Sequence, residues 1–343
     1  MTSGREYIKN SLVALLGILI ALVFSEIWVR IFDVAPQVGA TSHERYRLSP
    51  NVMIGIEPVE NFQIGVDRSN ALGYRGPLYA LQKSPLVFRV VVLGDSVSEG
   101  LLIPDYKDVY SAVLESELNG SGLAAEVMNF GVNGYNTSQE VQTFRDKGLK
   151  FSPDLVLLQY SLNDNTGDDG GLAGELIKKA RGQAFIEGVW DHPFLLNSAL
   201  YRFIKYRVLR YSTDAHWMKA NAALEQIGKD RVREEFAELR KMTGHSCVLV
   251  AIFPWFEKGL TPYPYQDQHV RVASFAEENG FMVIDMLDVF RKCEVESGAK
   301  ANIDHVHPNV TGHRCAGQAL ASYLRESDLI ASCSSVVGKL GNY

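Results

Sequence analysis

Apolar runs alternate with amphipathic stretches through most of this chain. Continuous apolar, β-branched runs predict five strands that are buried on both faces, at Phe88–Leu93, Val127–Phe130, Asp154–Tyr160, Cys247–Phe253 and Phe281–Asp285. Stretches with apolar residues at helical spacing predict helices at about 106–118, 137–149, 228–242, 265–279 and 309–325. Strands that alternate with helices are typical of a parallel sheet covered on both faces, so the pattern predicts an α/β fold.

The N-terminal segment carries a different pattern, a long apolar run. Between Lys9 and Arg30 lie twenty residues, of which only Glu26 is charged, and the apolar centre of the run is Leu12–Phe24. A helix of that length spans about 30 Å, the thickness of the hydrocarbon core of a bilayer. Glu26 would cost roughly 2.5–3.5 kcal/mol at the bilayer centre. We therefore expect Glu26 near the interface, beside Trp28 and Arg30.

Three interpretations of this run stay open: a signal anchor, a cleaved signal peptide, and a buried helix of a soluble protein. A cleaved signal peptide needs a small-x-small site soon after the apolar run. The nearest match, Val38-Gly39-Ala40, begins fourteen residues after Phe24, which favours the anchor. Basic residues flank both ends of the run, so the distribution of Lys and Arg does not determine its orientation across a membrane.

The chain then divides into three parts. We expect residues 1–36 to form the N-terminal tail and transmembrane signal anchor, 37–86 a linker and N-terminal extension, and 87–343 the α/β domain. An insertion at about 165–227 interrupts the domain and carries the aromatic, basic run Leu200–Tyr211. This run predicts either an inserted helix packed over the sheet, or a lid or membrane-surface helix. In the second case, lipid headgroups or an anionic substrate would face Arg202, Lys205, Arg207 and Arg210.

Composition narrows the class of protein. The chain has 343 residues, 46% hydrophobic and 22% charged, as in a folded globular protein. Lys and Arg number 34 against 40 Asp and Glu, a net charge of −6, so we expect no nucleic-acid partner.

Four cysteines lack CxxC spacing, which excludes a zinc ribbon or a thioredoxin-type site: Cys247, Cys293, Cys315 and Cys333. They allow zero, one or two disulfides. Cys247 begins a predicted buried strand and is interpreted as a small core residue.

Polar residues and glycines follow the predicted strands at their carboxyl ends. Ser96 follows the first strand in Gly94-Asp95-Ser96, Gly134 follows the second, and Asn163 follows the third. Asp304 and His307 stand just before the last predicted helix. Ligands of doubly wound sheets bind beyond the carboxyl ends of the strands, so we expect these loops to converge on one site.

The residue types at this edge suit acyl transfer, which needs a nucleophile, a base, a group that orients the base, and donors for the oxyanion. Ser96 fits the nucleophile, His307 the base and Asp304 the orienting group. The Ser96 N–H, the Gly134 N–H and the Asn163 side-chain amide fit the oxyanion donors. The pattern therefore predicts a Ser-His-Asp triad that forms an acyl-enzyme.

In chain order, these blocks resemble those of the SGNH (GDSL-type) hydrolase superfamily. The blocks are Gly94-Asp95-Ser96, Gly134, Asn163 and Asp304-x-x-His307, and the resemblance spans residues 88 to about 325. It implies a flavodoxin-like three-layer α/β/α sandwich with a parallel five-stranded sheet, ester hydrolysis without a metal or other cofactor, and the residue roles given above.

One position departs from the family pattern. Ser161 stands where glycine is usual, which could narrow the site or change the backbone that places Asn163.

A second motif, Asn70-x-x-Gly73-Tyr74-Arg75-Gly76, is similar to family members associated with bacterial envelope or exopolysaccharide clusters. With the anchor, this resemblance implies a single-pass membrane protein whose domain lies in the periplasm or outside the cell. We expect an esterase that removes an acyl group, acetyl foremost, from a carbohydrate or related envelope ester. The alternatives are an O-acyltransferase acting on a polysaccharide, a lipase- or lysophospholipase-like esterase, and a non-catalytic glycan-binding protein.

Metal sites are the competing interpretation of the same region. Zinc could be bound by His305, His307 and His313 with Asp304, but this leaves Ser96 without a role. We therefore expect no metal ion.

Two further sequence patterns resemble binding sites, but each is explained without a ligand. The run Asp164–Glu175 imitates a calcium-binding loop but has Asp169 where that loop needs glycine. Aromatic residues after the fourth strand could line a sugar site, although aromatic packing is their commoner role: Trp255, Tyr263 and Tyr265.

Overall fold

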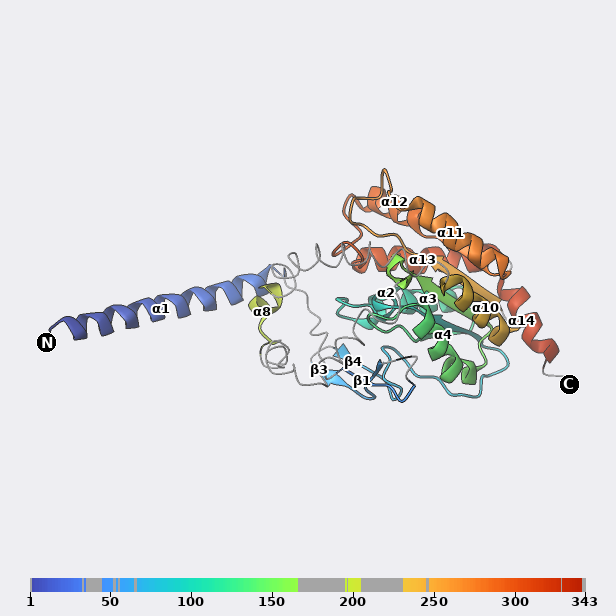
Figure 1. The fold of residues 1–343 in the computed structure, drawn as a ribbon, viewed down its shortest axis with the longest axis horizontal. Helices are drawn as coiled ribbons and strands as arrows, with labels where there is room; N and C mark the ends of the chain where they lie inside the picture. The colour runs from blue at the N-terminus through green and yellow to red at the C-terminus, as the bar shows by residue number, and fades with distance from the viewer. Residues whose placement is uncertain are drawn as a thin grey trace.

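A five-stranded parallel sheet forms the centre of the molecule (Figure 1). The computed structural model describes residues 2–32, 34, 45–51, 54, 56–64, 67–165, 195, 197–204, 231–244, 247–327 and 329–340. The strands are β5 (Phe88–Leu93), β6 (Ala125–Asn129), β7 (Leu155–Tyr160), β8 (Cys247–Ile252) and β9 (Met282–Asp285). They pair in parallel in the order β6-β5-β7-β8-β9, which is the flavodoxin-like order. All five predicted strands and the predicted fold class are confirmed.

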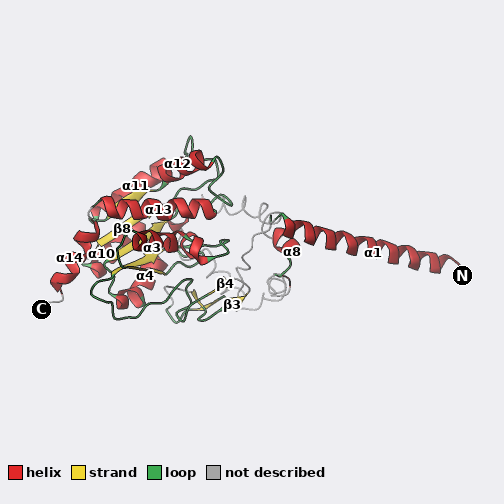
Figure 2. Ribbon diagram, turned by 180° about the vertical axis from the view of Figure 1, so that it is seen from behind, coloured by secondary structure: helices red, strands yellow, loops and turns green. Residues whose placement is uncertain are grey.

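Helices cover both faces of the sheet and complete three layers, with the strands between them (Figure 2). Successive residues of a strand face opposite sides, so Val90 and Val92 lie in one hydrophobic core while Val91 and Leu93 lie in the other. The first core is closed by α3 (Tyr110–Gly120), α12 (Leu287–Ser297) and α13 (Val310–Glu326). The second is closed by α4 (Thr137–Asp146), α10 (Arg231–Thr243) and α11 (Gln266–Glu278).

The predicted helices are present, with shifted ends and two additions. A short 3₁₀ turn, η1 (Tyr106–Asp108), precedes α3, and a second one, η2 (Gly148–Phe151), follows α4. The sequence pattern does not predict α12 or α14 (Leu329–Leu340). In α12 the buried residues are Leu287, Phe290 and Cys293, whereas the apolar Val295 is exposed, so its apolar residues do not all mark the buried face.

The part of the chain before the sheet contains two short antiparallel pairs. Strand β1 (Tyr46–Leu48) pairs with β2 (Ile56–Pro58), and β3 (Gln63–Ile64) pairs with β4 (Asp67–Arg68). The side chains of Tyr46, Ile56 and Tyr74 are buried in the second core. This extension therefore packs on the same face of the sheet as α4 and α10.

Two disulfides join the cysteines in pairs, Cys247–Cys333 and Cys293–Cys315. The first joins the start of β8 to α14, and the second joins α12 to α13. Cys247 packs against the first core, as expected, and it also forms one of the disulfides that the sequence left open. Its partner lies on α14, a helix that the sequence pattern does not predict.

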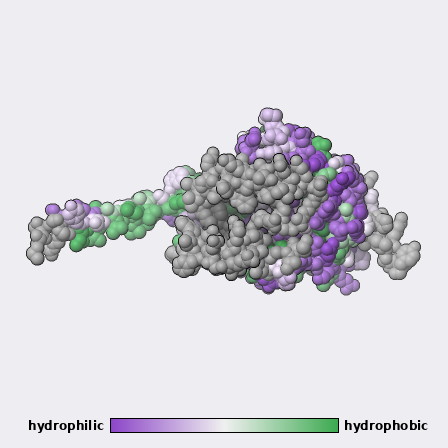
Figure 3. Space-filling model, viewed as in Figure 1, coloured by the Kyte–Doolittle hydropathy of each residue, from purple (hydrophilic) through white to green (hydrophobic). Residues whose placement is uncertain are grey.

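An N-terminal helix, α1 (Thr2–Ile31), projects away from the α/β domain (Figure 1). Its segment Glu6–Ile31 is long and apolar enough to cross a membrane, and only 6% of its most apolar window is buried in the protein. Hydrophobic residues colour much of its surface green in Figure 3. A buried helix of a soluble protein is therefore the wrong interpretation of this run.

The described part of the insertion packs on α1. It forms the short helix α8 (Ala199–Phe203), and Ala199 is buried together with Val29 of α1. The expectation that an inserted helix packs over the sheet is therefore wrong for this part. The remaining basic residues of the Leu200–Tyr211 run, from Lys205 onward, lie outside the described residues.

Candidate active site

Ser96 lies in a tight turn at the carboxyl end of β5, as the first residue of the short helix α2 (Ser96–Glu99). Asp95 caps this helix, because its carboxylate accepts the Val97 N–H at 2.8 Å. Gly94 has no room for a side chain, since a Cβ atom there would collide with the side chains of Ser98 and Gln159. Gly94 and Asp95 therefore each have a structural role in the turn that presents Ser96.

Ser96, His307 and Asp304 form a continuous chain of contacts. His307 Nε2 lies 2.8 Å from Ser96 Oγ, across 211 positions of sequence. On the other side of the ring, His307 Nδ1 lies 2.9 Å from both carboxylate oxygens of Asp304. Ser96 is 6% exposed and His307 5% exposed, so both groups are largely shielded from water. A buried hydroxyl and imidazole followed by a half-buried carboxylate can, in this order, deprotonate the serine and stabilise the resulting imidazolium.

Backbone contacts brace the turn that carries Asp304 and His307. Asp304 Oδ1 accepts the backbone N–H groups of Val306 and His307, at 2.9 and 2.8 Å. The Phe256 N–H, beyond β8, donates to the His305 carbonyl at 2.7 Å. The turn is thus held by its own carboxylate and by the segment after the fourth strand of the sheet.

Gly134 lies in the loop between β6 and α4, which packs directly on the Ser96 turn. The Val132 N–H donates to the Gly94 carbonyl at 3.1 Å, and the Asn133 N–H donates to Glu99 Oε2 at 2.6 Å. Gly134 itself is exposed and has a φ of +79°, a conformation that glycine adopts without strain. The structure therefore brings Gly134 to the edge where Ser96 lies.

Asn163 lies in the 3₁₀ turn η3 (Leu162–Asn165), directly after β7, and its side chain is outside the described part of the chain. The preceding residue that departs from the family pattern, Ser161, is buried. Its hydroxyl accepts Gln159 Nε2 at 2.8 Å, and its N–H donates to Asp164 Oδ2 at 2.9 Å. Gln159 Oε1 in turn accepts the Ser98 hydroxyl at 2.8 Å. Ser161 thus links this loop to the nucleophile turn through buried hydrogen bonds.

Glu99 is a residue of the site that the sequence analysis missed. Its buried carboxylate accepts Arg45 Nε at 2.7 Å, the Tyr46 hydroxyl at 2.8 Å and the Asn133 N–H at 2.6 Å. These contacts join α2, the N-terminal extension and the loop that carries Gly134. The sequence feature that could have indicated Glu99 is its position, three residues after Ser96 on a turn that follows a buried strand.

Two further carboxyl groups lie buried among the elements around Asp95. Burial and the charge of Asp95 raise the pKa of Glu140, on α4, well above its usual value. Burial and the charges of Glu140 and Asp95 raise the pKa of Asp164 in the same way. Both groups therefore favour the neutral form, which limits the negative charge that builds up around Asp95.

The three histidines of the zinc interpretation, His305, His307 and His313, each contact other protein groups. His313 Nδ1 accepts the Tyr110 N–H at 3.2 Å, and burial, with the charges of His307 and Arg75, lowers the pKa of His313 to about 3. The ring of His305 meets Trp255 edge-on. Among the described residues no group of three potential metal ligands lies close together. Asp168 and Glu175 of the calcium-like run lie outside that part of the chain.

Comparison with known families agrees with this geometry. Residues 92–315 match the model of the GDSL-like lipase/acylhydrolase family. The chain belongs to this family. The resemblance stated from the sequence is confirmed, and the protein is a carboxylic ester hydrolase of the GDSL type.

Several solved structures are similar to this GDSL hydrolase. The acetyl xylan esterase AlAXEase is 16% identical, with a TM-score of 0.43, over 69% of this chain and 99% of that one. A lipase/acylhydrolase from Enterococcus faecalis is 14% identical, with a TM-score of 0.42, over 70% and 96%. Axe2, an acetylxylan esterase from Geobacillus stearothermophilus, crystallised as a catalytic mutant, is 16% identical, with a TM-score of 0.42, over 69% and 93%. A comparison with curated proteins found no significant match.

Proposed function

We propose that this hydrolase is a membrane-anchored serine esterase that removes an acyl group, acetyl foremost, from a carbohydrate. The observation that carries the proposal is the 2.8 Å contact between Ser96 Oγ and His307 Nε2, with Asp304 on the other side of the ring. In this proposal Ser96 is the nucleophile, His307 the general base and Asp304 the group that orients His307.

The reaction proceeds in two steps. Ser96 Oγ attacks the ester carbonyl while His307 takes its proton, and the oxyanion of the tetrahedral intermediate accepts the Ser96 N–H, the Gly134 N–H and the Asn163 amide. The C–O bond to the sugar breaks, and His307 returns the proton to the departing hydroxyl. Water, deprotonated by His307, then attacks the acyl-enzyme and releases the free acid and Ser96.

A carbohydrate substrate is supported by the surroundings of the triad. The ring of His305, between Asp304 and His307, meets Trp255, which in turn meets Tyr265 edge-on at 5.8 Å between ring centroids. Trp255 itself is 7% exposed and lies in the second core, whereas Tyr265 and His305 are half-buried, so a sugar ring can pack only on the exposed parts of Tyr265 and His305.

We also propose that α1 is retained as an anchor and that the domain faces the periplasm or the exterior. The carboxylate of Glu26 accepts the Ser198 hydroxyl and the N–H groups of Ala199 and Leu200, at 2.7 to 2.9 Å. Cleavage after α1 would remove this partner of α8. The two disulfides support an oxidising compartment, because such bonds are rare in the cytosol.

Substitution of Ser96 tests the mechanism. With 4-nitrophenyl acetate as substrate, Ser96→Ala is expected to lower kcat by at least about a thousandfold, because the nucleophile is lost. A fluorophosphonate probe should label the original protein and leave the variant unlabelled. The exposed serine of α11 provides a matched control, and Ser274→Ala should retain both activities.

Equal turnover by Ser96→Ala and the original protein would contradict the proposed triad. Products formed from an acetylated oligosaccharide then test the reaction type. Free acetate is expected, whereas transfer of acetyl groups to an added oligosaccharide would indicate an acyltransferase.

A further inference from the structure

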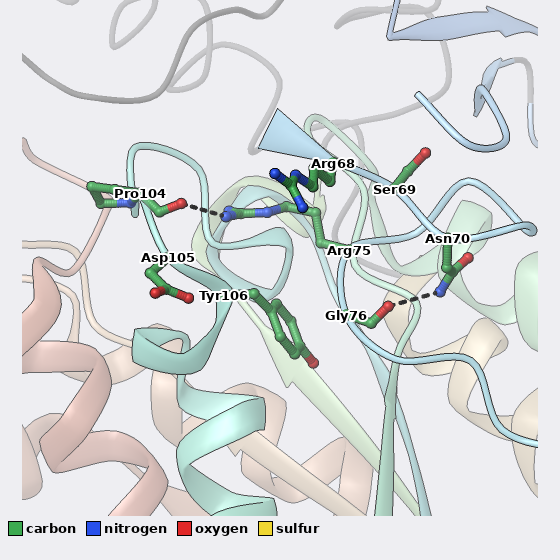
Figure 4. A pocket seen from close by; sticks show the side chains of 8 residues that line it. All are labelled: Arg68, Ser69, Asn70, Arg75, Gly76, Pro104, Asp105 and Tyr106. Atoms are coloured by element: carbon green, nitrogen blue, oxygen red, sulfur yellow. Dashed lines mark hydrogen bonds between the residues drawn. The ribbon is translucent and has the colours of Figure 1, made fainter. Parts of the chain in front are cut away.

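The proposed mechanism does not use one motif of the N-terminal extension, Asn70-x-x-Gly73-Tyr74-Arg75-Gly76. This motif lies outside residues 92–315, the part of the chain that matches the family model. The motif and the two residues before it form one wall of an open cavity of about 540 Å³, and residues 104–106 form the facing wall (Figure 4). The motif therefore meets the segment that follows the nucleophile helix α2.

Asn70 holds this motif in a turn. Its Oδ1 accepts the Tyr74 N–H at 3.2 Å, and its Nδ2 donates to the Gly76 carbonyl at 3.3 Å (Figure 4). Gly76 has a φ of +104°, and a Cβ atom there would collide with the ring of Tyr106. The backbone on both sides of Arg75 is therefore held in place.

The guanidinium of Arg75 donates to four backbone carbonyls of the segment that follows the nucleophile. Its Nη1 lies 3.2 Å from the carbonyl oxygen of Glu99 and 2.6 Å from that of Gly100. Its Nη2 lies 2.9 Å from the carbonyl oxygen of Ile103 and 3.4 Å from that of Pro104 (Figure 4). Arginine suits this place because its planar fork presents several donors in a fixed geometry. One side chain, 4% exposed, thus ties the end of α2 to the loop beyond it.

A single peptide group connects Arg75 to the nucleophile residue. The carbonyl oxygen of Gly100 accepts Arg75 Nη1, and the N–H of the same peptide group, that of Leu101, donates to the Ser96 carbonyl at 2.9 Å. Successive hydrogen bonds through one peptide group polarise and strengthen one another. The helix α2 has only four residues, too few for a ladder of helical hydrogen bonds to hold its ends. Arg75 therefore supplies support that the short helix lacks.

We propose that Arg75 is a positioning residue, which holds the nucleophile turn so that the Ser96 hydroxyl and the Ser96 N–H keep the geometry needed for acyl transfer. Small displacements of reacting groups cost rate, because the reacting atoms must lie close together and aligned. The proposal rests on the proposed role of Ser96 as the nucleophile. It makes the N-terminal extension part of the catalytic unit, although the match to the family model begins only at residue 92.

A matched pair of arginine variants tests this role in the full-length chain in detergent. Arg75→Lys keeps the charge but loses the planar fork, so kcat for 4-nitrophenyl acetate should fall at least about fivefold. KM should change less than about twofold, because Arg75 contacts the turn and not the substrate. The control is Arg89→Lys. Arg89 is 1% exposed and donates to the carbonyls of Leu81 and Phe151, at the opposite end of β5 from Ser96. This control should lower Tm and leave kcat within about twofold.

Chemical rescue separates positioning from a general loss of stability. In Arg75→Ala, the open cavity gives guanidinium a route to the carbonyls that have lost their donor. Guanidinium chloride at about 20 mM, far below denaturing concentrations, should raise kcat of this variant at least about threefold, and sodium chloride should not. Amide hydrogen exchange at Leu101, read by mass spectrometry, should be faster in Arg75→Ala and slow again when guanidinium is added.

The results that would overturn the positioning role are full kcat in both Arg75 variants, an equal loss of kcat in Arg89→Lys, or a raised KM at unchanged kcat. A loss in Arg75→Ala that guanidinium does not restore would also count against it. Ser96→Ala is measured in parallel. If Ser96→Ala keeps full activity, the proposed triad fails. If Ser96→Ala is inactive while the Arg75 variants are fully active, only the positioning role fails.

Discussion

The carboxylate of Glu99 shows how one side chain can connect the catalytic turn to distant parts of the chain. It is 3% exposed and pairs with Arg45, which is 2% exposed. Breaking a buried ion pair by removing one partner typically costs about 3–5 kcal/mol, because the remaining charge stays buried. Glu99 also holds the Asn133 N–H, next to the proposed oxyanion donor Gly134.

Neutralising Glu99 should therefore affect catalysis as well as stability. Glu99→Gln is expected to lower kcat about tenfold with a smaller change in KM, because a loosened Gly134 N–H stabilises the transition state less well. It should also lower Tm. Steady-state kinetics with 4-nitrophenyl acetate measure the first effect, and Glu277→Gln, on the exposed face of α11, is the control. A lower Tm with unchanged kcat would make Glu99 a purely structural residue.

His313 makes the stability of the fold depend on pH. Burial lowers its pKa from the ordinary 6.5 of histidine to about 3 in the folded protein, so between these two values the unfolded chain binds a proton that the folded chain does not. Stability from this group is therefore present above about pH 6.5 and is lost as the pH falls. The loss amounts to about 2 kcal/mol between pH 7 and pH 5.

Replacement of His313 by a residue that does not titrate should remove this contribution. In His313→Asn, the side-chain oxygen can still accept the Tyr110 N–H. Urea unfolding at pH 5 and pH 7 is expected to show a smaller difference in unfolding free energy for the variant than for the original protein. The same pH dependence in both proteins would assign it to other groups.

At the scale of elements, the two disulfides stabilise the fold to different degrees. Cys247–Cys333 closes 86 residues and Cys293–Cys315 closes 22. A longer closed loop removes more entropy from the unfolded chain, so the chain-entropy model gives about 4.6 kcal/mol for the first bond and about 3.4 kcal/mol for the second. The first bond is also the covalent link between α14 and the sheet.

Paired serine variants compare the two bonds. Cys247→Ser with Cys333→Ser should lower Tm more than Cys293→Ser with Cys315→Ser, measured by calorimetry under the same conditions. A larger loss from the shorter loop would show that contacts around α12 and α13, and not loop closure, determine the effect.

At the scale of the whole molecule, the contact between α1 and α8 joins the insertion to the proposed anchor. Glu26 accepts two backbone N–H groups at the start of α8, and Arg30 Nη2 donates to the Asn197 carbonyl at 2.8 Å. A charged residue in an apolar helix is costly in lipid unless it is paired. Here the pairing also fixes where the insertion lies relative to the proposed anchor.

Removing the Glu26 carboxylate should loosen the contact of α8 with α1, because the N-terminal N–H groups of α8 lose their acceptor. In the full-length chain in detergent, Glu26→Ala is expected to speed amide hydrogen exchange at Ala199 and Leu200, read by mass spectrometry of the peptide that contains them. Glu6→Ala, at the opposite end of the same helix, is the control. Unchanged exchange in Glu26→Ala would contradict the docking of α8 on α1.

What the sequence determined by itself is the set of elements and the chemistry at their ends. The five strands are visible because burial on both faces requires continuous apolar runs such as Phe88–Leu93, and this property is local. Parallel strands bring their carboxyl ends to one edge, so Ser96, Asp304 and His307 could be predicted to meet before any contact was known.

Only the tertiary structure decided the contacts that depend on which elements are neighbours. The partner of Cys247, the three donors on Glu99 and the docking of α8 on α1 all join segments far apart in the chain. Burial and polarity at a single position indicate that a side chain needs a partner. They do not indicate which one, because that choice is made by the packing of the whole molecule.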